Sequence, residues 1–442
     1  MGAKQCSGYD RADKDLHHAN VKETAFPERL GNTTEDVGCF GYLALVIELV
    51  LIGCFCLTDY DFASSTVFDA GTASQFFIGI AIFMLAGYGL QGSWMKAFGM
   101  SSFGFALLII VIALQESILV EGYIVHETLE LRLNINDLIS ASTATVAVLI
   151  SWGALAGKIS PIVMIWVVSC ETLIFWINEH FVLKNTFQTV DVAGCISIHV
   201  FGAFFGVACS FGHGLTPYTQ LHRPVYASDV FANVSVALLW IYFPTFNGST
   251  IPMNTAEQRT AMLNTIFALL GSTAAAFATG PIFNPTGAIF TSQMLRVATL
   301  SGGVAISAIC NMGMGPGGAL IIGFLAGTLS SYFVHLQNDS RRPLIEKLEL
   351  SDSYGVMFLN GMPGVLGAIV SAVLPLFIAD TYIIWTDQLL GLLTTISIAS
   401  ISGFLVGRIA KCRDVFTTPD LDYNDSTYWK TADDIPNFGY YN

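Results

Sequence analysis

The hydrophobic residues of this chain gather in long, unbroken runs, not in an alternating or one-sided pattern. An apolar run of about 20 residues is long enough to cross the hydrocarbon layer of a membrane as a helix. The runs are too continuous for the alternating strands of a membrane β-barrel. The pattern predicts twelve membrane-spanning helices joined by short loops, at residues 39–57, 75–94, 103–120, 135–156, 162–182, 192–211, 230–246, 261–280, 289–310, 319–334, 355–378 and 389–406.

The predicted fold class is therefore an all-α polytopic membrane protein, with polar segments at both ends. We expect a cytoplasmic N-terminal tail at residues 1–38, a transmembrane domain at 39–408 and a cytoplasmic C-terminal tail at 409–442. The N-terminal segment lacks the apolar core of a signal peptide, so the first apolar run is interpreted as a retained span.

The distribution of Lys and Arg supports twelve spans, because cytoplasmic loops carry an excess of basic residues. With both tails inside, 15 of the 19 basic residues lie on the inner side, three lie outside, and Arg296 lies within a span. The outer loops instead carry carboxylates. This acidity reflects either the usual shortage of basic residues outside or a surface that concentrates a cationic substrate.

The amino-acid composition excludes several classes of function. Hydrophobic residues make up 53% of the chain and charged residues 12%, too few to cover soluble domains, and the net charge of −14 is unsuited to nucleic acid. The nine cysteines have no metal-ligand spacing, and no glycine-rich phosphate loop is present. We therefore expect no cofactor, no metal and no enzymatic activity.

One histidine, His199, lies in the middle of a predicted span. Ionisable groups at membrane depth usually face a pore or the interior of a bundle. His199 either hydrogen bonds to a neighbouring helix or lines a pore, and its surroundings favour the pore. Asp191 starts the same span and is expected to cap it as an ionised carboxylate, while Gly202 and Gly206 form a face for close helix contact.

A second unusual span contains Asn360, Gly361, Pro363 and Gly364, which interrupt or thin a helix. Interrupted helices at matching positions of two halves indicate a transporter's site. With the first span set aside, the spans of His199 and Asn360 are each the fifth of five. This favours an inverted five-plus-five repeat, although almost no residue-level similarity between the halves is evident.

Other charges within the spans are expected to be structural. Either Glu116 or Glu171 is a candidate ion-pair partner for Arg296, and the sequence does not decide between them.

Ordered motifs along the chain resemble the Rhesus (Rh) branch of the ammonium transporter family. The extra first span also fits the Rh type. The matching segments are MSSFGFALLI (100–109), GALAGKISP (153–161), LIFWINE (173–179), YASDVF (226–231), LWIYFPTFN (239–247), ATLSGGVA (298–305), GALIIGF (318–324) and DYNDSTYW (422–429).

The resemblance implies a homotrimer in which each subunit has eleven core helices around its own narrow pore, plus an N-terminal helix. His199 matches the first of the family's two pore histidines, and Asn360 takes the place of the second. Phe246 matches one of two stacked entrance phenylalanines, and Thr143 takes the place of the other. Asp191 matches the acidic residue beside the entrance.

Our first hypothesis is a multi-pass plasma-membrane channel for ammonium and ammonia. Ammonium would be deprotonated at an acidic outer vestibule, and NH₃ would diffuse past His199 and Asn360. An Rh-like scaffold in the lipid bilayer with weak or no transport is the alternative, with the acidic and aromatic segment 420–429 as its docking peptide. A CO₂ channel is a third reading.

Overall fold

The computed structural model describes residues 30–60, 70–125, 131–214, 224–283, 290–338, 351–377, 383–412, 425 and 428–429. The chain divides into two compact units, Met1–Val46 and Ile47–Asn442. The described part of the first unit is the beginning of helix α1 (Leu30–Phe55), and the second unit holds all the other elements.

Within the described residues, ten helical stretches are long and apolar enough to cross a membrane. This confirms the predicted all-α polytopic architecture. The stretches are Ala73–Trp94, Gly99–Ile124, Ile135–Leu155, Pro161–Thr186, Cys195–His213, Tyr226–Gly248, Ala256–Phe283, Gly315–Gln337, Met357–Leu376 and Trp385–Lys411.

These stretches are built from α-helices and from short π and 3-10 segments that continue them. The α-helices are α2 (Ala70–Ile82), α3 (Gly89–Gln91), α4 (Gly99–Val120), α5 (Ile135–Leu155), α6 (Pro161–Trp176), α7 (Phe201–His213), α8 (Tyr226–Gly248), α9 (Ala256–Phe283), α12 (Gly315–Asn338), α14 (Met362–Val373) and α15 (Trp385–Cys412). The π segments are η2 (Phe83–Tyr88), η4 (Glu121–Val125), η5 (Ile177–Thr186), η6 (Cys195–Val200) and η9 (Met357–Gly361). The 3-10 turns η3 (Gly92–Trp94) and η10 (Leu374–Leu376) and the paired strands β1 (Asp59–Tyr60) and β2 (Arg132–Leu133) complete this part.

The two remaining predicted spans differ from expectation. The first begins at Leu30 instead of residue 39, and its apolar part is Phe40–Phe55. The span predicted at 289–310 is not one helix: it divides into α10 (Ser292–Ala298), α11 (Ser301–Ile306) and η8 (Ser307–Ile309). At the break, the Thr299 carbonyl accepts a hydrogen bond from Ser272 Oγ at 2.8 Å. A side chain of α9 thus satisfies a backbone group where the helix is interrupted.

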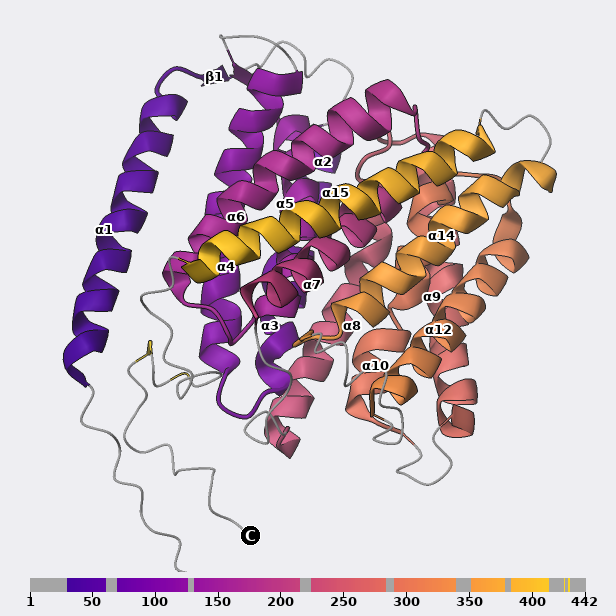
Figure 1. Ribbon diagram of the computed structural model, residues 1–442. Coiled ribbons are helices and arrows are strands. Elements are labelled where there is room, and N and C mark those ends of the chain that lie inside the picture. Colours follow the sequence, from indigo (N-terminus) through magenta and orange to yellow (C-terminus); the bar gives the residue numbers. More distant parts are fainter. Residues whose placement is uncertain are drawn as a thin grey trace, which may run out of the picture. The chain divides into compact units, whose positions relative to one another are not determined.

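The core of the second unit lies around α5 and α7. Helix α7 packs against α5 on one side and α15 on another, and α14 and α15 run side by side (Figure 1). As predicted, Gly202 and Gly206 lie where a helix approaches closely: a Cβ on Gly206 would lie 2.6 Å from Ser151 Cα. Because these two positions have no side chain, the backbones of α7 and α5 lie in close contact.

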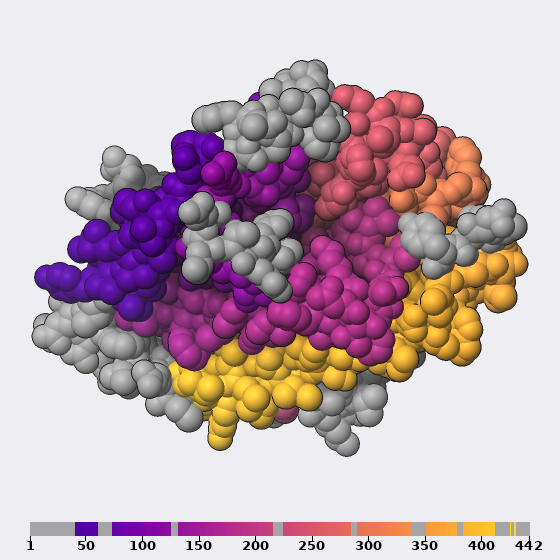
Figure 2. Space-filling model, turned by 90° about the horizontal axis from the view of Figure 1, so that it is seen from above, coloured from indigo at the N-terminus to yellow at the C-terminus, as the bar shows by residue number. Residues whose placement is uncertain are grey.

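The outer helices expose apolar side chains, as expected of a surface that faces lipid. Helix α15 lies at the surface along one edge of the view in Figure 2, with Leu393 60% and Ile401 62% exposed.

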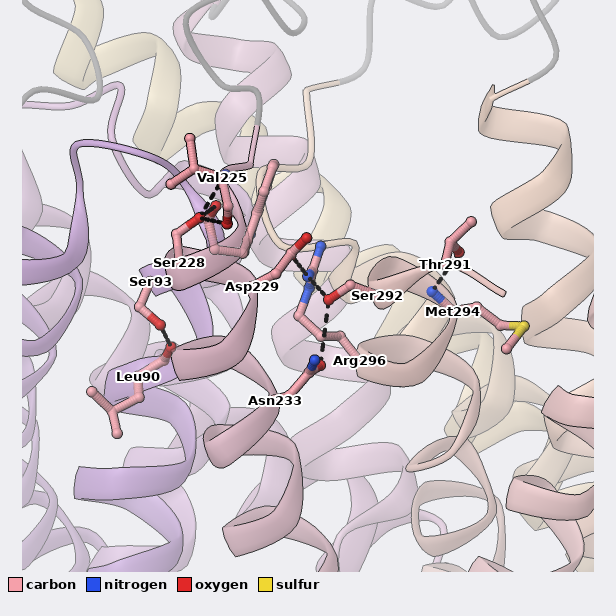
Figure 3. A network of polar contacts seen from close by, with 11 residues as sticks. Leu90, Ser93, Val225, Ser228, Asp229, Asn233, Thr291, Ser292, Met294 and Arg296 are labelled. Atoms are coloured by element: carbon pink, nitrogen blue, oxygen red, sulfur yellow. Dashed lines mark hydrogen bonds and ion pairs between the residues drawn. The ribbon is translucent and has the colours of Figure 1, made fainter. Parts of the chain in front are cut away.

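Neither predicted partner of Arg296 was correct. Arg296 Nη1 lies 2.8 Å from Asp229 Oδ1 and donates to Ser292 Oγ at 2.7 Å (Figure 3). Glu116 instead accepts from Ser169 Oγ at 2.6 Å, and Glu171 accepts from Ser151 Oγ. The Arg296–Asp229 pair ties α10 to the first turn of α8.

A short piece of the C-terminal tail binds the start of α4. The Asp425 carboxylate accepts hydrogen bonds from Met100 N at 2.9 Å and Ser101 N at 2.7 Å, so it caps two free N–H groups of the helix. Trp429 Nε1 donates to Ser101 Oγ at 2.9 Å, and its ring packs over Gly104. These tail residues are therefore engaged with their own chain.

Replacing this cap should destabilise the protein. We expect Asp425→Ala to lower the free energy of unfolding by about 0.5–2 kcal/mol, because two α4 N–H groups lose their acceptor. The measurement is the midpoint of thermal unfolding in detergent. Glu257→Gln, which alters an exposed carboxylate, is the control; equal midpoints for Asp425→Ala and wild type would contradict the assigned cap.

Candidate functional site

Asp191 organises the start of the span that carries His199. Its carboxylate accepts from Ile196 N at 3.0 Å, from Ser197 N at 2.7 Å and from Ser197 Oγ at 2.8 Å. Gly194 lies between them with φ 77° and ψ 35°, a left-handed conformation that suits glycine. The cap and this turn fix where η6 begins, and hence where His199 lies.

Asp352 does the same for the span that carries Asn360. Its carboxylate accepts from the N–H groups of Gly355, Val356 and Met357, each at 2.9 Å. Gly355 has φ 78°, and η9 starts two residues later. Asp352 is a functional residue that our sequence reasoning missed.

The two segments share one spacing, a similarity between the halves that our sequence reasoning overlooked. In each segment, Gly lies three positions after Asp, and the candidate pore residue lies five positions after Gly. These residues are Asp191, Gly194 and His199 in one segment and Asp352, Gly355 and Asn360 in the other. The sequence signal was D-x-x-G-x-x-x-x-H/N. The match supports the predicted repeat.

Both capping carboxylates are partly buried, and their desolvation raises the pKa of each above its ordinary value. The hydrogen bonds from backbone N–H groups act in the opposite direction and favour the charged form. Because every acceptor bond is made to the helix start, the role of Asp191 is to hold the backbone in place.

His199 and Asn360 meet in the interior. His199 Nδ1 lies 3.0 Å from Asn360 Oδ1, and the two residues are 0% and 1% exposed. A carbonyl oxygen only accepts, so Nδ1 carries the hydrogen and Nε2 of the neutral ring is an acceptor. Among the described residues, His199 Nε2 and Asn360 Nδ2 have no hydrogen-bond partner. The pair thus presents one free acceptor and one free donor.

Two phenylalanines, Phe243 and Phe246, lie beside His199, and a third, Phe83, stacks behind them. Phe246 stacks on Phe83 of η2, with ring centroids 4.8 Å apart and planes at 12°. The His199 ring centroid lies 5.9 Å from that of Phe243 and 6.1 Å from that of Phe246. Phe83 is a second residue that sequence reasoning missed, since nothing near it in the sequence marks it as the stacking partner.

Thr143 lies apart from this stack. It lines a cavity of about 420 Å³, together with Asp191 and Ser197. His199 and Phe246 do not line the cavity. Of the predicted site residues, the structure therefore brings His199, Asn360 and Phe246 together, with Asp191 and Thr143 at the neighbouring cavity.

The arrangement suits a small neutral molecule with hydrogen-bonding capacity. A bare cation would have to lose its water among aromatic rings, which is very costly. Within the described ranges, no group of three or more His, Cys, Asp or Glu residues could hold a metal ion.

A family model described as Ammonium Transporter Family matches residues 47–413. The chain is 34% identical over 381 residues to the ammonium transporter Rh type B-B of Xenopus laevis, covering 79% of this chain and 80% of that protein. It is 30% identical over 413 residues to the ammonium transporter Rh type A of Bos taurus, covering 89% of this chain and 95% of that protein.

Solved structures agree with these relatives. The fold is similar to that of Nitrosomonas europaea Rh50, in a study of conduction by the Rhesus protein family of channels, with a TM-score of 0.71 and 28% identity over 81% of this chain and 92% of that one. A protein described as a sensor Amt protein shares the fold with a TM-score of 0.63 and 20% identity, over 79% of this chain and 95% of that one.

The two aspartate caps should prove equivalent. We expect Asp191→Ala and Asp352→Ala each to reduce the free energy of unfolding by about 1–2 kcal/mol, since each removes the acceptor of several buried N–H groups. Asp→Asn at either position keeps one oxygen and should cost less. Thermal unfolding in detergent measures both series, with Asp387→Asn as control; a loss confined to Asp191 would refute the equivalence.

Proposed function

This chain belongs to the ammonium transporter family, in its Rhesus (Rh) branch, and on that premise we propose that it is a channel that passes ammonium nitrogen across the membrane as neutral NH₃. The single observation that carries the proposal is the buried His199–Asn360 pair with one unused acceptor and one unused donor.

These two free atoms match the chemistry of NH₃. An N–H of ammonia donates to His199 Nε2, and its lone pair accepts from Asn360 Nδ2. Ammonium gathers in the cavity beside Asp191 and Thr143 and transfers its proton to water there before it reaches Phe246. The proton stays behind because the rings around His199 offer a cation no replacement for water. NH₃ is reprotonated at the opposite end.

Asparagine in the second position limits what the pair does. The amide carries no proton at neutral pH, so His199 cannot pass a proton to Asn360. Its carbonyl also holds His199 in one tautomer. The proposed transport is therefore electroneutral at this point of the path.

The Phe83–Phe246 stack acts as the gate in this proposal. Phe83 is 0% exposed and Phe246 1%, and the cavity does not reach His199 in this conformation. Conduction therefore includes movement of these rings. Phe83 takes the stacking role that Thr143 does not fill.

The remaining parts of the proposal follow the resemblance: a homotrimer in the plasma membrane, with the Asp191 end outside and both tails inside. The transmembrane domain takes up most of the chain, between tails at 1–38 and 409–442. The scaffold alternative has less support, because Asp425 and Trp429, within its supposed docking peptide, bind the chain's own α4.

Flux measurements test the channel. Stopped-flow uptake of methylammonium into proteoliposomes should exceed that of empty vesicles. We expect His199→Ala to reduce the flux about 5-fold, the equivalent of one hydrogen bond of about 1 kcal/mol, whereas Asn360→His should retain it. His335→Ala, at the end of α12, is the matched histidine control. Flux no higher than in empty vesicles would defeat the proposal, and competition by CO₂ would identify a gas channel instead.

Electrical recording tests the neutral step. Because His199 and Asn360 cannot relay a proton, we expect no methylammonium-dependent current in planar bilayers that hold flux-competent protein. A current of one charge for each transported molecule would show that the cation itself, or NH₃ with a proton, crosses the pair.

A further inference from the structure

An ion pair at the mouth of the cavity depends on π-helical geometry. Lys184 Nζ lies 2.5 Å from Glu179 Oε1, and both residues belong to η5. A π-helix bonds residue i to i+5, so side chains five apart lie on one face; in an α-helix, neighbours are three or four apart. The same spacing recurs in the contact between His180 and Asn185, at 3.1 Å.

Both members of the pair line the cavity that also holds Asp191 and Thr143. Among the described residues that line it, Lys184 is the one basic residue. The Lys184 side chain is 60% exposed and that of Glu179 17% exposed. The lysine is thus the more exposed partner, and the glutamate is the more buried one.

Glu179 is the carboxylate of this cavity with capacity for a cation. Asp191 uses both its oxygens to cap η6. Glu179 Oε2, in contrast, is buried and has no hydrogen-bond partner among the described residues. Lys184 holds the other oxygen.

We infer that Lys184 is a tethered competitor of the transported cation, occupying Glu179 until ammonium displaces it. The inference rests on the proposed function and names what sets substrate affinity at its entrance. The lysine head is a primary alkylammonium, the same chemical group as methylammonium. Because it is attached to the helix that carries Glu179, its effective concentration is high, and free substrate must compete with it.

Removal of the lysine should improve substrate binding without changing the later steps. In proteoliposomes, Lys184→Gln should lower the KM for methylammonium about 2- to 5-fold, the range that a partly exposed ion pair supports, with the maximal flux unchanged. Glu179→Gln should raise the KM. In the Glu179→Gln background, Lys184→Gln should have no further effect, because the competitor has lost the site for which it competes.

Two controls separate this role from simpler ones. Arg259→Gln removes an exposed charge in the first turn of α9 that does not line the cavity, and it should leave the KM unchanged. If Lys184 acts only by repulsion, Lys184→Gln lowers the KM equally with and without Glu179, and that result would overturn the inference. So would an unchanged KM in Lys184→Gln alongside normal wild-type flux. Absent wild-type flux would instead refute the channel itself.

Discussion

A helix whose first turn is buried leaves backbone N–H groups with no water to bind, and this constraint determines the centre of the molecule. Asp191 and Asp352 supply the acceptors at two such helix starts. Since each cap fixes the first turn, the residue eight positions later has a determined place. His199 and Asn360 therefore meet although 161 residues separate them in the chain.

Around that meeting point, polarity is confined to a few atoms. The phenylalanine rings make this region costly for charge, while the two free atoms of the pair suit a small neutral base. In the proposed mechanism, the cation is bound at a distance from this pair, in the cavity where Glu179 and Lys184 lie. In this proposal, binding of a cation and passage of a neutral molecule take place at separate points along one route.

The sequence predicted what depends on local pattern: most of the spans, the cap at Asp191 and the close glycines of α7. It could not predict what depends on distant contacts, such as Phe83 on Phe246, Asp229 on Arg296, or Ser272 at the break before α11. The π segments were not predicted for a different reason: a change of the helical hydrogen-bond register does not alter the pattern of apolar residues in the sequence. Asp352 was readable from spacing and was overlooked.

The contact between the C-terminal tail and α4 affects the choice of where to truncate the chain for expression. The family match ends at residue 413, so a truncated variant designed from sequence similarity would end there. A truncation there would remove Asp425 and Trp429, leaving two α4 amides without their acceptor and a hollow beside Gly104. The end of the family match at residue 413 is therefore not the end of the folded unit.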